Sequence, residues 1–192
     1  MQQSITTEEI NLLPQLQFEG EIVIVDNPTI LEKAIKELKD ITVLGFDTET
    51  KPSFSKGVHH HVCLLQLSTQ EKCYLFRLNK IGLPDEVKTI LASPNIVKVG
   101  AAVADDIKGL QKLSHFEAQG FSDLQKVAVK KGIIDIGLKK MVAILLGYRI
   151  SKRQKLTNWE VPEYTPSQQS YAATDAWVSL LLHEKLKTLP LI

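Results

Sequence analysis

Residues 41–49 read ITVLGFDTE, an apolar run that ends in two carboxylates. A short apolar run of this kind is typical of a buried strand. Side chains two apart on a strand point to the same face, so we expect Asp47 and Glu49 to project side by side and Thr48 to face the other way. Like charges this close repel each other unless a cation lies between them. Because divalent ions bind oxygen ligands, the pair is a candidate metal site.

Two more carboxylates follow a second predicted strand. Asp105 and Asp106 come directly after residues 97–103, where a strand passes through small residues into a helix. We expect one of the two to be the N-cap of that helix, because an aspartate there accepts a hydrogen bond from an unpaired backbone N–H. The other is then free to face the same cleft as Asp47. The residues alone leave open which of the two aspartates takes which role.

A late helix carries one further acid. Asp175 lies among small apolar residues, in the segment AATDAW at 172–177. This segment predicts a buried helix, where an unpaired carboxylate is costly. Tyr171 precedes Asp175 by four residues and shares its helix face. Acids that converge from three elements are what a pair of hard cations requires, and such a pair can hold a phosphodiester for hydrolysis.

The rest of the chain predicts an α/β domain. Segments 62–68 and 73–78 flank a polar connector, which is a hairpin pattern. Hairpin strands followed by a strand–helix alternation and then by helices favour a mixed sheet covered by helices, with a helical C-terminal half. Strands are predicted at 21–25, 41–49, 62–68, 73–78 and 96–100, and helices at 28–39, 84–92, 104–113, 122–131, 137–146 and 166–187.

Composition is that of a soluble globular protein. The 192 residues are 44% hydrophobic and 23% charged, with a formal net charge of +1, which neither indicates nor excludes nucleic acid as a partner. We expect an N-terminal arm at 1–20 and a single domain at 21–192. Cys63 and Cys73 match no zinc or redox spacing and are expected to be buried free thiols. With no signal-peptide pattern and no membrane-length apolar run, a cytoplasmic location is expected, without membrane attachment.

As an ordered set, these motifs resemble the DEDDy branch of the DnaQ-like 3′–5′ exonucleases, and the RNase D and Werner-syndrome exonuclease domains in particular. The resemblance covers about residues 21–187. It extends to residues 64–67, 137–140, 145–147 and 158–159. Its central motifs are, in chain order, Asp47-x-Glu49 at the end of a long strand, Asp106 after Lys98-Val99-Gly100, and Tyr171-x-x-x-Asp175 in a late helix.

The resemblance implies a ribonuclease H-like fold, with a mixed five- to six-stranded sheet flanked by helices. It also implies hydrolysis of DNA or RNA from a free 3′ end, releasing nucleoside 5′-monophosphates, with two Mg²⁺ or Mn²⁺ ions as cofactors. In that scheme Asp47 bridges both ions, Glu49 and Asp175 hold the ion that activates water, and Asp106 serves the other ion. Tyr171 orients the nucleophile.

Candidate substrate-binding residues lie near these acids. Phe54 is placed to stack on a terminal base, although a plain hydrophobic plug is an equal alternative. The run 59–61 consists of histidines, and adjacent residues on an extended segment alternate faces and do not converge easily on one ion. A loop tip that touches substrate is the better interpretation for them. The full candidate set is Thr48, Phe54, His61 and Asn158.

Alternatives remain for the function. The chain could be a catalytically inactive exonuclease-like module that binds nucleic acid or protein, but retention of all four acids argues against this. An endonuclease of the wider ribonuclease H-like group fits the motifs less well. Tyr171 has the alternative of a packed aromatic with its hydroxyl at the surface. No motif distinguishes DNA from RNA or identifies a protein partner.

Overall fold

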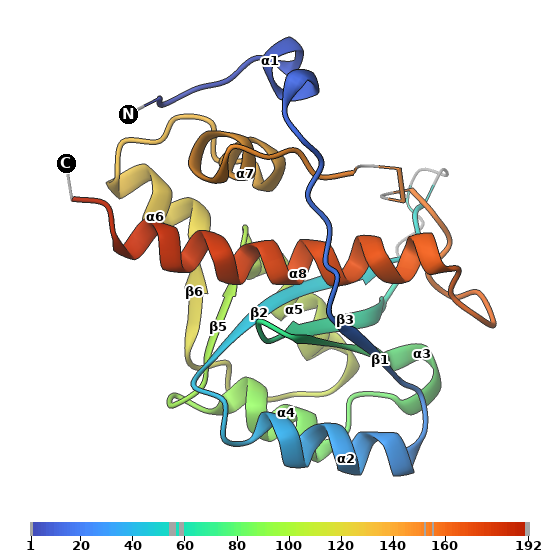
Figure 1. The fold of residues 1–192 in the computed structure, drawn as a ribbon. Helices are drawn as coiled ribbons and strands as arrows, with labels where there is room; N and C mark the ends of the chain where they lie inside the picture. Colours follow the sequence, from blue (N-terminus) through green and yellow to red (C-terminus); the bar gives the residue numbers. More distant parts are fainter. Residues whose placement is uncertain (1, 54–56, 58–59, 152, 155, 191–192) are drawn as a thin grey trace.

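A mixed sheet forms the centre of the computed structural model, which describes residues 2–53, 57, 60–151, 153–154 and 156–190 (Figure 1). Within these residues the sheet has six strands in the order β1-β4-β3-β2-β5-β6. The pairs β2–β3 and β3–β4 are antiparallel, and the remaining pairs are parallel. The strands are β1 (Glu21–Val25), β2 (Val43–Thr50), β3 (Val62–Ser68), β4 (Lys72–Arg77), β5 (Val97–Gly100) and β6 (Phe121–Asp123).

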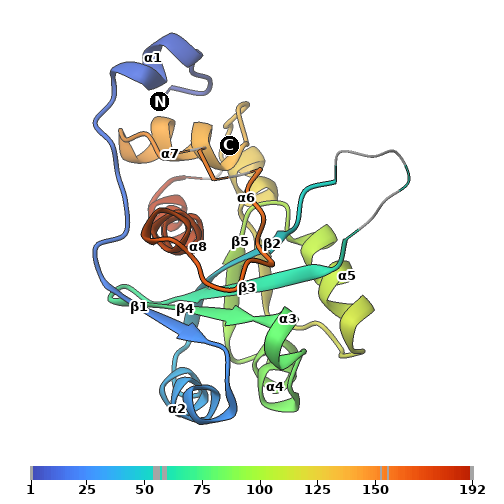
Figure 2. The ribbon, with the colours of Figure 1, turned by 90° about the vertical axis from the view of Figure 1, so that its right-hand side faces the viewer.

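Helices cover both faces of this sheet (Figure 2). Helices α2, α4 and α5 pack on one face, and α6, α7 and α8 pack on the other. The predicted mixed sheet with flanking helices and a helical C-terminal half is confirmed. The helices are α1 (Thr7–Leu12), α2 (Pro28–Leu38), α3 (Leu78–Ile81), α4 (Asp85–Ala92), α5 (Val103–Leu113), α6 (Leu124–Lys130), α7 (Leu138–Leu146) and α8 (Pro166–Lys187).

The long helix α8 lies directly on the sheet. It begins with a capping box, in which Thr165 and Gln168 each bond the other's backbone N–H. Farther along, the alanines at 172, 173 and 176 are buried against the strands. Gly45 of β2 lies beneath them, where a Cβ atom would overlap the backbone oxygen of Ala176. Small residues on both sides therefore let α8 approach β2 closely.

The prediction of a helix at 122–131 is wrong at its start. Residues 121–123 form the edge strand β6, which pairs in parallel with β5. Helix α6 begins only at Leu124, and the side chain of Asp123 caps it by accepting a hydrogen bond from the backbone N–H of Gln125 (2.9 Å). A strand of three residues is too short to show an alternating pattern, so the polar pair before Leu124 resembled a helix start.

Residues before β1 pack along α8 and α7 (Figure 1). Ile10 of α1 is buried together with Ala143 of α7. Farther along, the backbone N–H of Phe18 donates to the hydroxyl of Thr174 on α8 (3.0 Å). This N-terminal segment therefore lies against α7 and α8, which pack on the same face of the sheet.

Cys63 and Cys73 are buried and free, as predicted. Burial raises the pKa of the Cys63 thiol to about 12, and burial also raises the pKa of Cys73. Both thiols therefore stay protonated at neutral pH. Among the described residues, no helix combines the length and the apolar character that crossing a membrane requires.

Candidate active site

Three carboxylates from two elements meet at one end of β2. Asp47 and Glu49 lie two residues apart on β2, on the same face of the strand, and this face packs against α8. Asp175 lies on α8 and belongs to the same group of carboxylates. Each residue offers one carboxylate oxygen, and these oxygens all lie within 4.8 Å of one another. The structure thus brings together three of the four predicted metal ligands.

The electrostatics of this group favour a cation. The pKa of Asp47 is raised well above its ordinary value, first by burial and then by the negative charges of Asp175, Glu49 and Asp106. A cation among these oxygens would offset both the repulsion and the cost of burial. Because the donors are carboxylate oxygens, they fit a hard divalent ion such as Mg²⁺ or Mn²⁺.

Asp106 lies beside this group but outside it. It is in the first turn of α5, where it accepts a hydrogen bond of 2.5 Å from the hydroxyl of Thr48. Thr48 faces away from Asp47 and Glu49, as its position on the strand predicts. Burial raises the pKa of Asp106, and the negative charge of Asp106 contributes to the raised pKa of Asp47.

The predicted N-cap at Asp105 or Asp106 is wrong. Helix α5 begins earlier, with Ala102 as its N-cap in the left-handed region (φ 60°) and without a side-chain cap. The backbone N–H of Ala102 instead donates to a carboxylate oxygen of Asp123 (3.1 Å). Asp105 is exposed and pairs with Lys108 (3.0 Å). Asp106 is therefore the member of the pair that reaches β2.

Tyr171 lies one helical turn before Asp175. Burial raises the pKa of its hydroxyl, and the negative charge of Asp175, the charge of Glu49 and a hydrogen bond to Asp175 raise it further. The phenol therefore stays protonated over the physiological range. Its ring lies 6.0 Å from that of the buried Trp159, which fixes the ring while the hydroxyl faces the carboxylates.

Three cavities border the candidate acids. The largest, about 550 Å³, contains Asp47, Glu49 and Asp175 together with Lys139 and Lys140 at the start of α7. A cavity of about 310 Å³ on the other side of β2 is lined by residues of β2, the segment before β3, and α5, among them Thr48, His60, His61 and Asp106.

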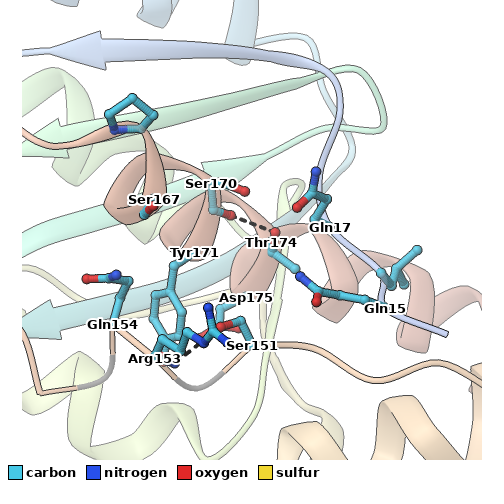
Figure 3. A pocket seen from close by; sticks show the side chains of 12 residues that line it. Gln15, Gln17, Ser151, Arg153, Gln154, Ser167, Ser170, Tyr171, Thr174 and Asp175 are labelled. Atoms are coloured by element: carbon cyan, nitrogen blue, oxygen red, sulfur yellow. Dashed lines mark hydrogen bonds between the residues drawn. The ribbon is translucent and has the colours of Figure 1, made fainter. Parts of the chain in front are cut away.

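The third cavity, about 340 Å³, shares Tyr171 and Asp175 with the largest one. Figure 3 shows Arg153 and Ser151 beside these two residues, with Gln15 and Gln17 of the N-terminal segment farther along the same cavity. The carboxylates are therefore accessible to solvent through more than one cavity.

The predicted substrate-binding residues are spread around this region. His61 is exposed and lines the smallest cavity. Thr48 donates its hydroxyl to Asp106. Asn158 is exposed, and its side chain accepts a hydrogen bond from the backbone N–H of Glu160 (2.9 Å). Phe54 lies outside the described residues.

Several residues that line the cavities carry no functional signal in the sequence. Ser151 borders the two larger cavities, and Arg153 borders one of them. Both lie in an irregular segment after α7, where periodicity gives no signal. Gln125 lines the largest of the three cavities from the start of α6. The predicted helix begins at residue 122 instead of 124, so the sequence does not place Gln125 at a helix start. Lys139 lies in the motif at residues 137–140, and no pattern distinguishes it as a cavity residue.

Comparison with known proteins gives one family. A family model described as 3′–5′ exonuclease matches residues 22–189. The bifunctional 3′–5′ exonuclease/ATP-dependent helicase WRN of Mus musculus is 32% identical over 187 residues, which cover 92% of this chain. Exonuclease 3′–5′ domain-containing protein 2 of Drosophila melanogaster is 33% identical over 186 residues, again 92% of this chain. This chain spans only 13% and 31% of the lengths of those two relatives.

A solved structure shares the fold of this chain. RNase D of Escherichia coli, described as an exoribonuclease involved in structured RNA processing, superposes with a TM-score of 0.75 at 21% identity. The match covers 87% of this chain and 45% of that chain. At this identity the likeness concerns the fold, and it confirms the predicted ribonuclease H-like architecture.

Proposed function

Since this chain belongs to the 3′–5′ exonuclease family, we propose that it hydrolyses phosphodiester bonds of DNA or RNA from a free 3′ end and releases nucleoside 5′-monophosphates. The observation that carries the proposal is the meeting of Asp47, Glu49 and Asp175 within 4.8 Å, with Asp106 and Tyr171 beside them. We further propose that residues 21–192 are the exonuclease domain and that residues 1–20 are its N-terminal arm.

The proposed cofactors are two divalent cations, Mg²⁺ or Mn²⁺. Asp47 would serve both ions, as the resemblance to the DEDDy exonucleases implies. Glu49 and Asp175 would hold one ion, and Asp106 would hold the other. When bound, such ions activate the attacking water and stabilise the departing oxygen of the phosphodiester.

Tyr171 is proposed to orient the attacking water. Its hydroxyl stays protonated and lies beside Asp175, so it can donate one hydrogen bond and accept another. Hydrogen bonds of this kind can hold the attacking water in a fixed orientation. The packing of the ring near Trp159 keeps the hydroxyl in place without help from the substrate.

The proposed substrate path follows the cavities. Lys139 and Lys140 border the largest cavity and are suited to phosphate oxygens, because an ammonium group binds phosphate as a point charge. On the other side of β2, His61 with Thr48 is proposed to contact the terminal nucleotide. Phe54 and Asn158 remain candidates for the same role. Two buried free thiols agree with a reducing compartment, and we propose the cytoplasm as the location.

The test uses DNA and RNA strands of one sequence, each labelled at the 5′ end, with Mg²⁺ or Mn²⁺. A 3′–5′ exonuclease converts these strands into a ladder of shorter products and releases nucleoside 5′-monophosphates. Strands with a blocked 3′ end should resist, whereas an endonuclease would cut them. Binding without shortening of any strand would contradict the proposal and favour the inactive binding module. The chelator EDTA and the variant Asp175→Asn serve as controls.

A further inference from the structure

Gln66 is a buried amide in the middle of β3. Its side chain is 0% exposed, and neither Nε2 nor Oε1 has a hydrogen-bond partner among the described residues. Buried side-chain amides are normally hydrogen-bonded, because an unpaired one destabilises the fold. Gln66 is therefore a buried polar group that the described residues leave without a stabilising partner.

The sheet places this amide next to the candidate metal ligands. In the antiparallel pairing of β2 with β3, Gln66 lies directly opposite Asp47. Residues that face each other in this way share one face of the sheet, with Cβ atoms about 4.5–5.5 Å apart. A glutamine side chain is long enough to span that distance, so its amide can reach the carboxylate of Asp47.

The other surroundings of Gln66 on this face are apolar. Leu75 faces it from β4, and Leu64 precedes it by two residues on the same face. Both leucines belong to the buried cluster that includes the alanines at 172, 173 and 176 of α8. A polar partner is therefore to be sought on the β2 side, where the carboxylates lie.

We propose that Gln66 is a positioning residue for Asp47, whose carboxylate it holds by donating an amide N–H when a divalent cation is bound. This inference rests on the proposed function. A ligating carboxylate has oxygens left to accept further hydrogen bonds, and such outer partners fix the orientation of the ligand. A neutral donor is suited to this place because it adds no charge to the group.

Gln66→Met tests the proposal, because methionine keeps the approximate shape of glutamine and removes its polar atoms. The melting temperature of the metal-free variant should equal or exceed that of the original protein, since an unpaired amide is lost. Its affinity for Mn²⁺, measured by calorimetry without nucleic acid, should fall by about 10- to 100-fold, as expected for an outer partner of a metal ligand. Turnover at subsaturating Mn²⁺ should fall with it.

Two variants provide matched controls. Gln168 is also a buried glutamine, but its amide is paired, with Nε2 donating to the backbone oxygen of Asn158 (3.2 Å). Gln168→Met should therefore lower the melting temperature, opposite to Gln66→Met. Ser68 lies on the same face of β3, two residues from Gln66, and its hydroxyl bonds to Thr69 O (2.8 Å). Ser68→Ala should leave the affinity for Mn²⁺ unchanged.

The outcomes separate this inference from the proposed function. If the original protein binds Mn²⁺ and shortens strands while Gln66→Met binds Mn²⁺ equally well, the inference is overturned and the exonuclease proposal stands. A variant that melts lower or fails to fold also counts against it, because the amide then has a structural partner. If the original protein neither binds Mn²⁺ nor shortens any strand, the proposed function itself fails.

Discussion

The individual acids at the end of β2 have different environments despite their similar chemistry. Asp47 is partly buried and repelled by its neighbours, Asp106 is bonded to Thr48, and Asp105 is exposed beside Lys108. A buried and repelled carboxylate destabilises a metal-free protein, whereas an exposed ion pair contributes little. Substitutions at these positions therefore separate catalytic from structural effects.

Asp47→Asn should abolish activity without harming the fold. Asparagine has nearly the same shape but no charge, so the repulsion by the neighbouring acids disappears. We expect the melting temperature of the metal-free protein to stay the same or rise, and turnover to fall by about 10³-fold or more. Thermal unfolding in EDTA and a strand-shortening assay check the two effects. Undiminished turnover would remove Asp47 from the mechanism.

Asp106→Asn and Asp105→Asn form a matched pair. The two aspartates are adjacent in α5, but only Asp106 reaches β2, through the hydroxyl of Thr48. We expect Asp106→Asn to lower turnover by about 10²-fold or more and Asp105→Asn to leave it within about twofold, since its ion pair is exposed. The same assay measures both, and equal effects would show that the assignment of Asp106 is mistaken.

Tyr171→Phe removes one hydroxyl and keeps the ring. The contact with Trp159 should hold the phenylalanine in place, so the fold and the affinity for Mn²⁺ should change little. Turnover should fall by about 10²-fold, because the water loses the group that orients it. Calorimetry with Mn²⁺ and single-turnover kinetics separate these quantities. Equal losses of binding and turnover would instead indicate a structural role.

At the scale of elements, the site depends on how closely α8 approaches β2. Gly45 lies under Ala176, where a Cβ atom would overlap the helix backbone. Backbone cannot move aside as a flexible side chain can, so any larger residue at this point must lift α8. Because α8 carries Asp175 and β2 carries Asp47, the spacing between the helix and the sheet also sets the spacing between the carboxylates.

Gly45→Ala should therefore weaken both stability and activity. We expect the free energy of unfolding to fall by about 2–3 kcal/mol, within the range for overpacking in a core, and the affinity for Mn²⁺ to fall as the carboxylates separate. Gly137→Ala is the stability control, since a Cβ there meets nothing within 4 Å. Urea unfolding and calorimetry measure the two effects. A stable variant with full affinity for Mn²⁺ would contradict this account of the packing.

The strands and helices with a clear hydrophobic period were the elements that the sequence could predict. Residues 28–38 and 166–187 show the helical period or a strong cap, whereas β6 and α3, with three and four residues, are too short for any period to appear. Asp47, Glu49 and Asp175 were found because charge is unusual beside apolar runs. The hydrogen bond from Thr48 to Asp106 was not predictable, since it joins residues 58 apart in the chain.

At the scale of the whole molecule, the two cysteines report on global folding. Both thiols are buried in the sheet, so reaching them requires the sheet to open. An unfolded cysteine has a pKa of about 8.5, while burial raises the pKa of Cys63 to about 12 and also raises the pKa of Cys73. The unfolded chain thus loses thiol protons at a pH where the folded protein keeps them.

A thiol-specific reagent such as iodoacetamide should leave both cysteines of the native protein unmodified at pH 8 and should modify both in urea. The same pKa differences have a thermodynamic effect: as the pH rises above about 8.5, the unfolded state binds fewer protons than the folded state, so the free energy of unfolding decreases. Replacing both cysteines by alanine should reduce that decrease. Mass spectrometry and urea unfolding at pH 8 and pH 10 provide the measurements. Rapid labelling of the native protein would contradict the burial of these thiols.

The order in which the carboxylates occur along the chain has a consequence for biosynthesis. Asp47 and Glu49 are made early, but Asp175 lies on α8, which must fold back over the sheet to reach them. While the ribosome is still making α8, the nascent chain holds only part of the group of acids. The group of acids is therefore complete only after α8 has left the exit tunnel and packed on the sheet.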